Sequence, residues 1–202
     1  AARCTTVKPA GTSSIVLGSS SGIHAWHAPY YIRRVRLGKD EPMYKYLAGK
    51  LPELIEDDYF NPKNQAVLSI PQEAPKGAIY RSESCFDLLE RTLRFNEEWV
   101  RAGHRHGDNT NNVSCTLSVK DEDWNLLGKA MWEERSKYNG LSVLPYDGGT
   151  YKQAPFEDCD KETFDKLSKG LTTIDVKQVV EFDDNTDLSA EAACAGGLCE
   201  VF

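Results

Sequence analysis

Short runs of β-favouring residues alternate with stretches of helical periodicity along most of this chain. Strands are predicted at residues 65–70, 113–119 and 141–145, and helices at residues 43–57, 84–101, 121–140 and 161–167. This alternation predicts an α/β fold with parallel strands. About four or five strands are too few for a closed barrel, and their open edges need cover. We therefore expect the chain to be one piece of a larger structure.

Local signals set the expected boundaries. Ser84 is the expected N-cap of the 84–101 helix, and Gly103 is its expected stop. Pro29 precedes residues 30–36, which we predict to be a helical turn. Pro71 is expected to end the strand at 65–70. The helix at 121–140 is expected to bury Trp124, Leu127, Met131 and Tyr138.

Composition excludes several classes of function. The 202 residues carry a formal net charge of −7, with 40% hydrophobic and 27% charged residues. This balance is typical of a globular protein and disfavours direct nucleic-acid binding. The sequence has no run of about 18 apolar residues, so no membrane span is predicted. No secretion signal is recognised, so we expect a cytoplasmic location with reduced thiols. The one basic cluster, Arg33–Arg36, is expected to be a solvated face.

Residues 113–119 alternate apolar and polar side chains, so Ser114, Thr116 and Ser118 share one face. In an open sheet this face would meet solvent, whereas in a barrel it would line a polar interior. The histidines carry weaker signals. His24 belongs to a loop of small residues that is expected to pack. The 104–109 loop is expected to be solvated, because nothing completes a metal ligand set there.

A Ser/Thr-rich turn lies near the start of the sequence. Residues 5–7 favour a short strand that Pro9 ends, and Gly11 lets the backbone approach a ligand closely. Residues 12–14 can cap a helix and offer hydroxyl donors. A strand, a glycine turn and a helix start together form an anion site when backbone N–H groups face the ligand. By themselves these residues favour an ordinary capped helix over an anion site, and both interpretations stay open.

Beyond residue 182 the composition becomes acidic and then rich in Ala, Gly and Ser, which predicts a flexible tail at 183–202. Cys194 and Cys199 lie within this tail, and the two glycines between them allow the turn that a disulfide needs. A dithiol on a flexible arm suits thiol–disulfide exchange. Half of a zinc site and a pair of incidental cysteines are the alternatives.

Residues 5–12, Thr-Thr-Val-Lys-Pro-Ala-Gly-Thr, resemble the phosphate-binding segment Thr-Val-Lys-Pro-Ser-Gly-Thr of the ribonucleotide reductase large chain, especially its adenosylcobalamin-dependent (class II) branch. Ala10 stands where the family usually has Ser, which removes one hydroxyl donor but leaves the backbone donors. The tail resembles the family's Cys-Ala-Gly-Gly-x-Cys-Glu ending. Further similar segments follow in the family's order at residues 21–24, 30–36, 75–78, 111–114, 141–145 and 151–157.

The resemblance implies a fold and a set of site residues. Residues 1–182 would form the C-terminal portion of a ten-stranded α/β barrel, and 183–202 would be the redox tail. Cys194 and Cys199 would re-reduce the active-site cysteines and be recycled by a thioredoxin-like protein. The implied reaction reduces ribonucleotides, with triphosphates preferred over diphosphates, by a radical mechanism that uses adenosylcobalamin. The substrate phosphates would rest on Pro9, Ala10, Gly11, Thr12, Ser13 and Ser14.

The family's radical-bearing cysteine lies upstream of the phosphate segment, in an Asn-x-Cys-x-Glu motif that this sequence lacks. The resemblance therefore implies a partner, an N-terminal reductase fragment that carries the radical cysteine, and predicts that this chain alone is inactive. Class II is favoured because the tandem tyrosines of class I members are absent after Leu144-Pro145. The alternative hypothesis is a non-catalytic phosphate-binding or regulatory module. A small redox protein that acts alone is disfavoured, since no Cys-x-x-Cys opens a helix.

Overall fold

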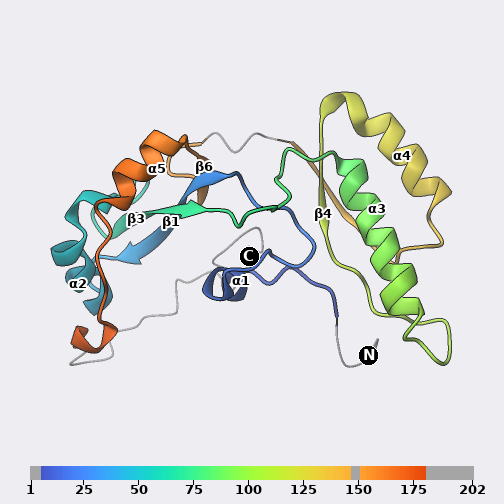
Figure 1. Ribbon diagram of the computed structural model, residues 1–202, viewed down its shortest axis with the longest axis horizontal. Coiled ribbons are helices and arrows are strands. Elements are labelled where there is room, and N and C mark those ends of the chain that lie inside the picture. Colours follow the sequence, from blue (N-terminus) through green and yellow to red (C-terminus); the bar gives the residue numbers. More distant parts are fainter. Residues whose placement is uncertain (1–5, 147–150, 181–202) are drawn as a thin grey trace. The chain divides into compact units, whose positions relative to one another are not determined.

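The computed structural model describes residues 6–146 and 151–180. These residues form two compact units, each with its own sheet. One unit comprises the described parts of residues 1–31 and 73–150, and the other those of residues 32–72 and 151–202. Figure 1 shows the helices and strands of both. Among the described residues, no helix combines the length and the apolar character needed to cross a bilayer.

The unit around residues 32–72 contains a four-stranded sheet in the order β2-β3-β1-β6. Its strands are β1 (Tyr30–Gly38), β2 (Ile55–Asp57), β3 (Gln65–Glu73) and β6 (Phe156–Asp158). β2 and β3 are antiparallel, with Ile55 opposite Leu68. The expectation of parallel strands is therefore wrong for this pair. Residues 55–57, predicted to end a helix, instead form a hairpin with β3.

Residues 30–36 lie in strand β1, so the helical turn predicted from Pro29 is wrong. Near the ends of β1, the Ala74 N–H donates to Pro29 O at 2.9 Å, and the Lys39 N–H donates to Asn64 O at 2.8 Å. β1 thus lies between β3 and β6, a setting that suits its aromatic and β-branched side chains. The proline signal was local, whereas the partner strands that decide the structure are distant in sequence.

β3 continues to Glu73, past its predicted end at Pro71. β2 pairs only with residues 66–68. The edge of β3 that β2 occupies is therefore open at Pro71, where a missing N–H costs no ladder hydrogen bond. Helices of this unit are α2 (Pro42–Lys50), η1 (Pro52–Leu54), α5 (Lys161–Ser168) and η4 (Val176–Gln178). The buried side chains of its core are Leu47, Leu51, Leu54 and Leu68.

The basic cluster of β1 is only in part the solvated face expected from the sequence, since Arg36 is exposed whereas Arg33 and Arg34 are half-buried. Arg34 pairs with Glu157 at 2.6 Å, and its side chain is only 11% exposed. The Arg36 Nε donates to the buried Asp58 carboxylate at 2.9 Å. These arginines therefore tie β1 to β6 and to the turn after β2, inside one unit.

The other unit is built around the parallel pair β4 (Thr116–Val119) and β5 (Ser142–Pro145). Its helices are α1 (Thr12–Leu17), α3 (Cys85–Phe95), the π-helical η2 (Asn96–Arg101), the 3-10 turn η3 (Asp121–Asp123) and α4 (Trp124–Glu133). Ser84 caps α3 as predicted, in a capping box with Asp87. The predicted apolar face of 113–119 is confirmed, since its four side chains are buried in the core: Val113, Cys115, Leu117 and Val119.

Helix α4 is shorter and less buried than predicted. It ends at Glu133, short of residue 140. Of the four side chains expected on its inner face, only Leu127 is buried, at 1% exposure, whereas Trp124 is 39% exposed. A two-stranded sheet presents a narrow surface, so it buries one row of this helix and leaves the flanking side chains outside.

Candidate functional site

The Ser/Thr-rich turn leads into helix α1, which confirms the predicted helix start. Residues 6–10 form no strand. Gly11 is the N-cap, with φ 50° and ψ −127°, and no side chain caps the helix. The expected capping by the hydroxyls of residues 12–14 is therefore wrong. The turn depends on glycine, because side chains of L residues rarely tolerate this backbone conformation.

Hydrogen bonds inside the turn decide which of its groups face outward. The Ser13 N–H donates to Ala10 O at 3.1 Å, and the Ser14 N–H donates to Gly11 O at 3.2 Å. The Ser14 hydroxyl also donates to Gly11 O, at 2.6 Å. Ser14 is buried, whereas Pro9, Ala10, Gly11 and Ser13 are exposed. The turn thus exposes its backbone and the Ser13 side chain to solvent, while the buried Ser14 stabilises the turn through its hydrogen bonds to Gly11 O.

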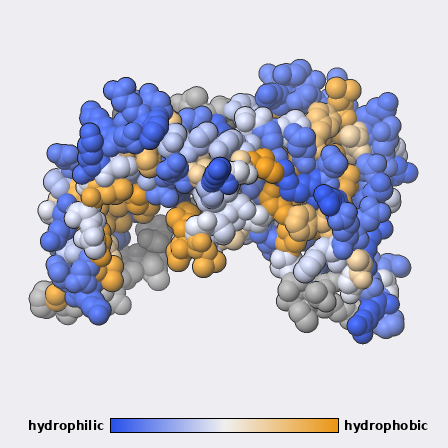
Figure 2. All heavy atoms as spheres, in the orientation of Figure 1, coloured by the Kyte–Doolittle hydropathy of each residue, from blue (hydrophilic) through white to orange (hydrophobic). Residues whose placement is uncertain are grey.

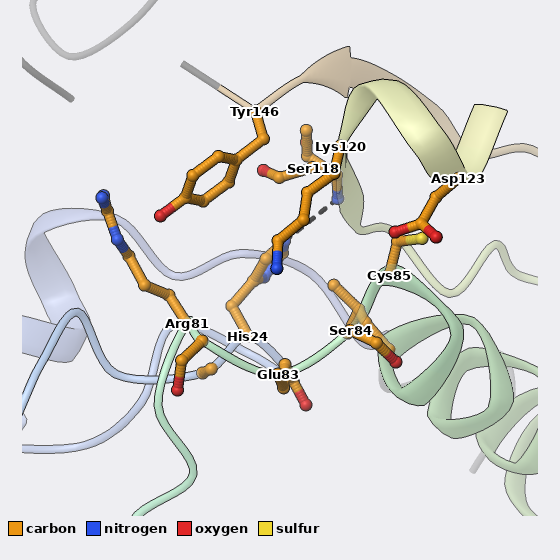
Figure 3. A pocket seen from close by; sticks show the side chains of 13 residues that line it. His24, Arg81, Glu83, Ser84, Cys85, Ser118, Lys120, Asp123 and Tyr146 are labelled. Atoms are coloured by element: carbon orange, nitrogen blue, oxygen red, sulfur yellow. Dashed lines mark hydrogen bonds between the residues drawn. The ribbon is translucent and has the colours of Figure 1, made fainter. Parts of the chain in front are cut away.

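A cavity of about 280 Å³ lies in the same unit, where β4 and β5 end (Figure 3). The first residues of α3 and the η3 turn also reach it. Ligands of α/β proteins commonly bind at the carboxyl ends of parallel strands, because the loops that follow the strands converge there. The lining includes His24, Arg81, Glu83, Ser84, Cys85, Thr116, Ser118, Lys120, Asp123 and Tyr146.

Charged side chains surround the cavity. Lys120 points into it from the end of β4, with Arg81 and Asp123 on opposite sides in Figure 3. Glu83 is paired with Arg91, whose two terminal nitrogens lie 3.1 and 2.5 Å from its carboxylate oxygens. With Glu83 neutralised in this way, the two cations outnumber the remaining carboxylate. The cavity therefore favours a ligand that carries negative charge.

Thr116 and Ser118 bring part of the polar face of the 113–119 strand to this cavity, and Ser118 is exposed there. Sequence reasoning missed Lys120, Tyr146 and Arg81. Lys120 and Tyr146 each follow directly on a predicted strand, so the ends of the strands were the signal that could have found them. Arg81 lies in irregular chain before α3 and carries no such signal.

Three cysteines lie in the described part of the chain, and all three are free. Burial, and then the nearby Asp123 carboxylate, raises the pKa of the Cys85 thiol. Burial likewise raises the pKa of the Cys115 thiol. The pKa of Cys159 is raised by burial and then by the Asp160 carboxylate. Thiols of this kind stay protonated at neutral pH and are weak nucleophiles.

The predicted exchange pair, Cys194 and Cys199, lies outside the described residues, so its geometry is not part of this site. No group of three or more His, Cys, Asp or Glu side chains among residues 6–146 and 151–180 could hold a metal ion. His104 Nε2 instead lies 2.7 Å from Gly107 O within its own loop.

Comparison with known proteins finds relatives that are named adenosylcobalamin-dependent reductases. No protein-family model matches it. The adenosylcobalamin-dependent ribonucleoside-triphosphate reductase of Lactobacillus acidophilus is 30% identical over 203 residues, which cover 98% of this chain and 26% of the relative. The enzymes of that name from Lactobacillus leichmannii and Levilactobacillus brevis are 29% and 27% identical, with the same coverage.

The chain is also similar in structure to a solved enzyme of this kind. The crystal structure of a B12-dependent (class II) ribonucleotide reductase matches with a TM-score of 0.68 and 27% identity, over 86% of this chain and 23% of that chain. The predicted α/β barrel portion is thereby confirmed as the fold class. The chain spans about a quarter of the length of the curated relatives it matches, 26%.

Proposed function

The chain is a homologue of one segment of the adenosylcobalamin-dependent (class II) ribonucleotide reductases, and from that premise we propose that it works as the substrate-phosphate and redox-tail part of such an enzyme. The observation that carries the proposal is sequence similarity to these enzymes, with 30% identity, that extends over 98% of the chain. The relatives are named ribonucleoside-triphosphate reductases, which supports a triphosphate substrate.

The proposed reaction replaces the 2′-hydroxyl of the ribose by hydrogen. Two thiols supply the electrons: they lose two hydrogen atoms and become a disulfide, and the hydroxyl leaves as water. Cys194 and Cys199 would return those electrons to the active site, and a thioredoxin-like reductant would restore them. Adenosylcobalamin supplies the radical that starts this chemistry when it is bound.

The cavity beside Lys120 does not fit the cobalamin. Pockets for drug-sized ligands measure about 300–1,000 Å³, and a corrin with its nucleotide tail is larger than such ligands. The cavity beside Lys120, about 280 Å³, is therefore too small for it. In our proposal the cobalamin pocket is completed by the N-terminal fragment, and we assign no step through the cofactor to the described side chains.

The turn at 9–14 is the proposed phosphate site. It is exposed at Gly11 and Ser13, and no acidic residue lies in the first turn of α1. A bound anion is therefore not repelled by a negative side chain there. Because the N–H groups of Ala10, Ser13 and Ser14 are bonded within the chain, the direct contacts proposed are the backbone of Gly11 and Thr12 and the Ser13 hydroxyl. The remaining members, Pro9, Ala10 and Ser14, would hold the shape of the turn.

The proposed partner is an N-terminal reductase fragment that carries the radical cysteine. Two features of this unit support a missing neighbour. Within the described residues, its sheet consists of the two strands β4 and β5. Helix α1 leaves Val16 and Leu17 exposed at 80% and 76%, and Figure 2 shows apolar surface over α1. Surfaces of this kind are usually covered by another part of an assembly.

The test is capture of partners by the tagged chain from its native lysate, followed by an assay of deoxyribonucleotide formation. We expect a large partner with an Asn-x-Cys-x-Glu motif, and product only when adenosylcobalamin is added. Cytidine triphosphate and diphosphate are compared as substrates. Capture without that motif, or an assembly that forms no product with the cofactor, contradicts the proposal and favours the non-catalytic module.

A further inference from the structure

We propose that His24 is a positioning residue that fixes the phosphate turn to strand β4, an inference that rests on the proposed phosphate role of residues 9–14. His24 contacts both sides of this connection. Its Nδ1 lies 2.9 Å from Ser21 O, and its Nε2 lies 3.0 Å from the backbone nitrogen of Thr116. Thr116 is the first residue of β4 and lines the cavity beside Lys120.

The two contacts allow one arrangement of protons on the imidazole. A carbonyl oxygen only accepts, so Nδ1 must carry a proton to bond Ser21 O. A backbone N–H only donates, so Nε2 must be unprotonated to accept a hydrogen bond from the Thr116 N–H. The neutral ring protonated at Nδ1 satisfies both bonds at once. His24 is thus a directional link between the loop and the strand, which neither Lys nor Arg could replace because they only donate.

The loop that carries His24 is joined to the phosphate turn on its other side. The Ala10 N–H donates to the Ser21 hydroxyl oxygen at 3.0 Å. A Cβ at Gly22, where φ is +62°, would lie 2.5 Å from Lys8 O, so the two segments touch backbone to backbone. Ala10, Ser21, His24 and Thr116 therefore form a continuous hydrogen-bonded path from the turn to β4.

The core holds this loop in place. Ile23 is buried among the side chains of α3 and β4, and its carbonyl oxygen accepts from Arg91 at 3.0 Å. A second bond ties the segment before the turn to the chain before β4, since the Ser114 N–H donates to Val7 O at 2.9 Å. A ligand that binds the turn therefore meets it already in one position relative to β4. Preorganisation of this kind raises affinity because less freedom is lost on binding.

Two substitutions separate the two bonds of the imidazole. The Asn side chain brings a donor near the position of Nδ1 but reaches no farther, so His24→Asn keeps the bond to Ser21 and loses the bond to Thr116. The longer Gln side chain places an oxygen near the position of Nε2. His24→Gln therefore keeps the bond to Thr116 and loses the side-chain bond to Ser21, while the backbone N–H of residue 24 still donates to Ser21 O at 3.2 Å.

A second pair of variants tests the other joint and controls for the loop. Ser21→Ala removes the acceptor of the Ala10 N–H. Ser20→Ala is the matched control, because the Ser20 hydroxyl donates to Gly22 O at 3.0 Å, inside the loop. Both changes remove one hydroxyl from neighbouring positions, and only the first breaks the path to the turn.

The experiment titrates the whole chain with inorganic tripolyphosphate in a calorimeter, at a temperature where urea unfolding shows every variant to be folded. His24→Asn, His24→Gln and Ser21→Ala should each weaken binding about two- to tenfold, the effect of one hydrogen bond. Ser20→Ala should bind as the unchanged chain does. A purely structural role would lower the unfolding midpoint and leave the affinity of the folded variants unchanged, which would overturn the inference.

Nitrogen NMR of the imidazole gives a second, independent readout. The proton should reside on Nδ1 of His24, and Nε2 should be unprotonated. A proton on Nε2 would contradict the hydrogen bond from the Thr116 N–H. If the unchanged chain binds no tripolyphosphate, the phosphate role of the turn fails, and the inference fails with it. If it binds and the three variants bind equally well, only the role of His24 is refuted.

Discussion

Gly11→Ala is the sharpest test of the phosphate turn. Gly11 has φ 50° and ψ −127°, and a Cβ built there meets nothing within 4 Å. The substitution therefore creates no clash, and its cost is backbone strain alone, about 1–3 kcal/mol. The free turn relieves this strain by moving to negative φ. A phosphate must then restore the strained shape, so its affinity should fall about five- to hundredfold.

Gly18→Ala is the matched control for this change. Gly18 ends the same helix in the left-handed region, with φ 59° and ψ 34°, and its Cβ also meets nothing within 4 Å. Gly18→Ala should lower stability by about 1–2 kcal/mol, whereas Gly11→Ala should lower it by less because its free turn relaxes. Only Gly11→Ala should weaken binding of inorganic tripolyphosphate in calorimetry. Equal affinities for the two variants, whether weakened or not, would refute the assignment of the turn.

Three further predictions follow from the same features. Cys194→Ser should stop turnover driven by a thioredoxin-like reductant in the assembled enzyme while sparing turnover on dithiothreitol; equal loss with both reductants would contradict the shuttle role. Asp58→Asn should lower the free energy of urea unfolding by about 2 kcal/mol, because the buried carboxylate accepts from Arg36 and from two backbone N–H groups, whereas exposed Asp57→Asn should cost under about 1 kcal/mol. Burial alone would raise the pKa of Asp58, but the hydrogen bonds from Asn61, Phe60 and Arg36 outweigh it and lower that pKa. This stabilisation is complete above about pH 4 and is lost as pH falls through the lowered pKa of the folded state, so unfolding free energies at decreasing pH should fall more steeply for the unchanged chain than for Asp58→Asn.

The sequence predicted best where a signal was local and strong. The capping box at Ser84 and the apolar alternation of 113–119 both depend on neighbours within a few residues, and both are confirmed. Gly11 was predicted to let the backbone approach a ligand, whereas the structure shows that glycine is needed there for the backbone conformation, and the hydroxyls do not cap the helix. Such features need no knowledge of the rest of the fold.

The failures share a different cause. β1 was mistaken for a helical turn because its partners, β3 and β6, lie far along the chain. Strand β2 was hidden at the end of a helical pattern, since only pairing with residues 66–68 makes it a strand. The cavity was missed for a related reason. Lys120 and Tyr146 belong to different strands that become neighbours only when β4 and β5 pair in parallel.

The burial of the described thiols limits which cysteines of this chain can supply electrons in the proposed reaction. Each turnover oxidises two thiols, and exchange requires a thiolate that another sulfur can reach. Cys85 and Cys115 are 5% and 4% exposed, and burial raises the pKa of each. Cys159 is less buried, but its raised pKa also disfavours the thiolate. Of the six cysteines in the sequence, Cys4, Cys194 and Cys199 remain, and the last two are the pair whose spacing lets them close a disulfide with each other. Given the proposed reaction, the burial of the described thiols therefore favours the same pair that the family resemblance implies.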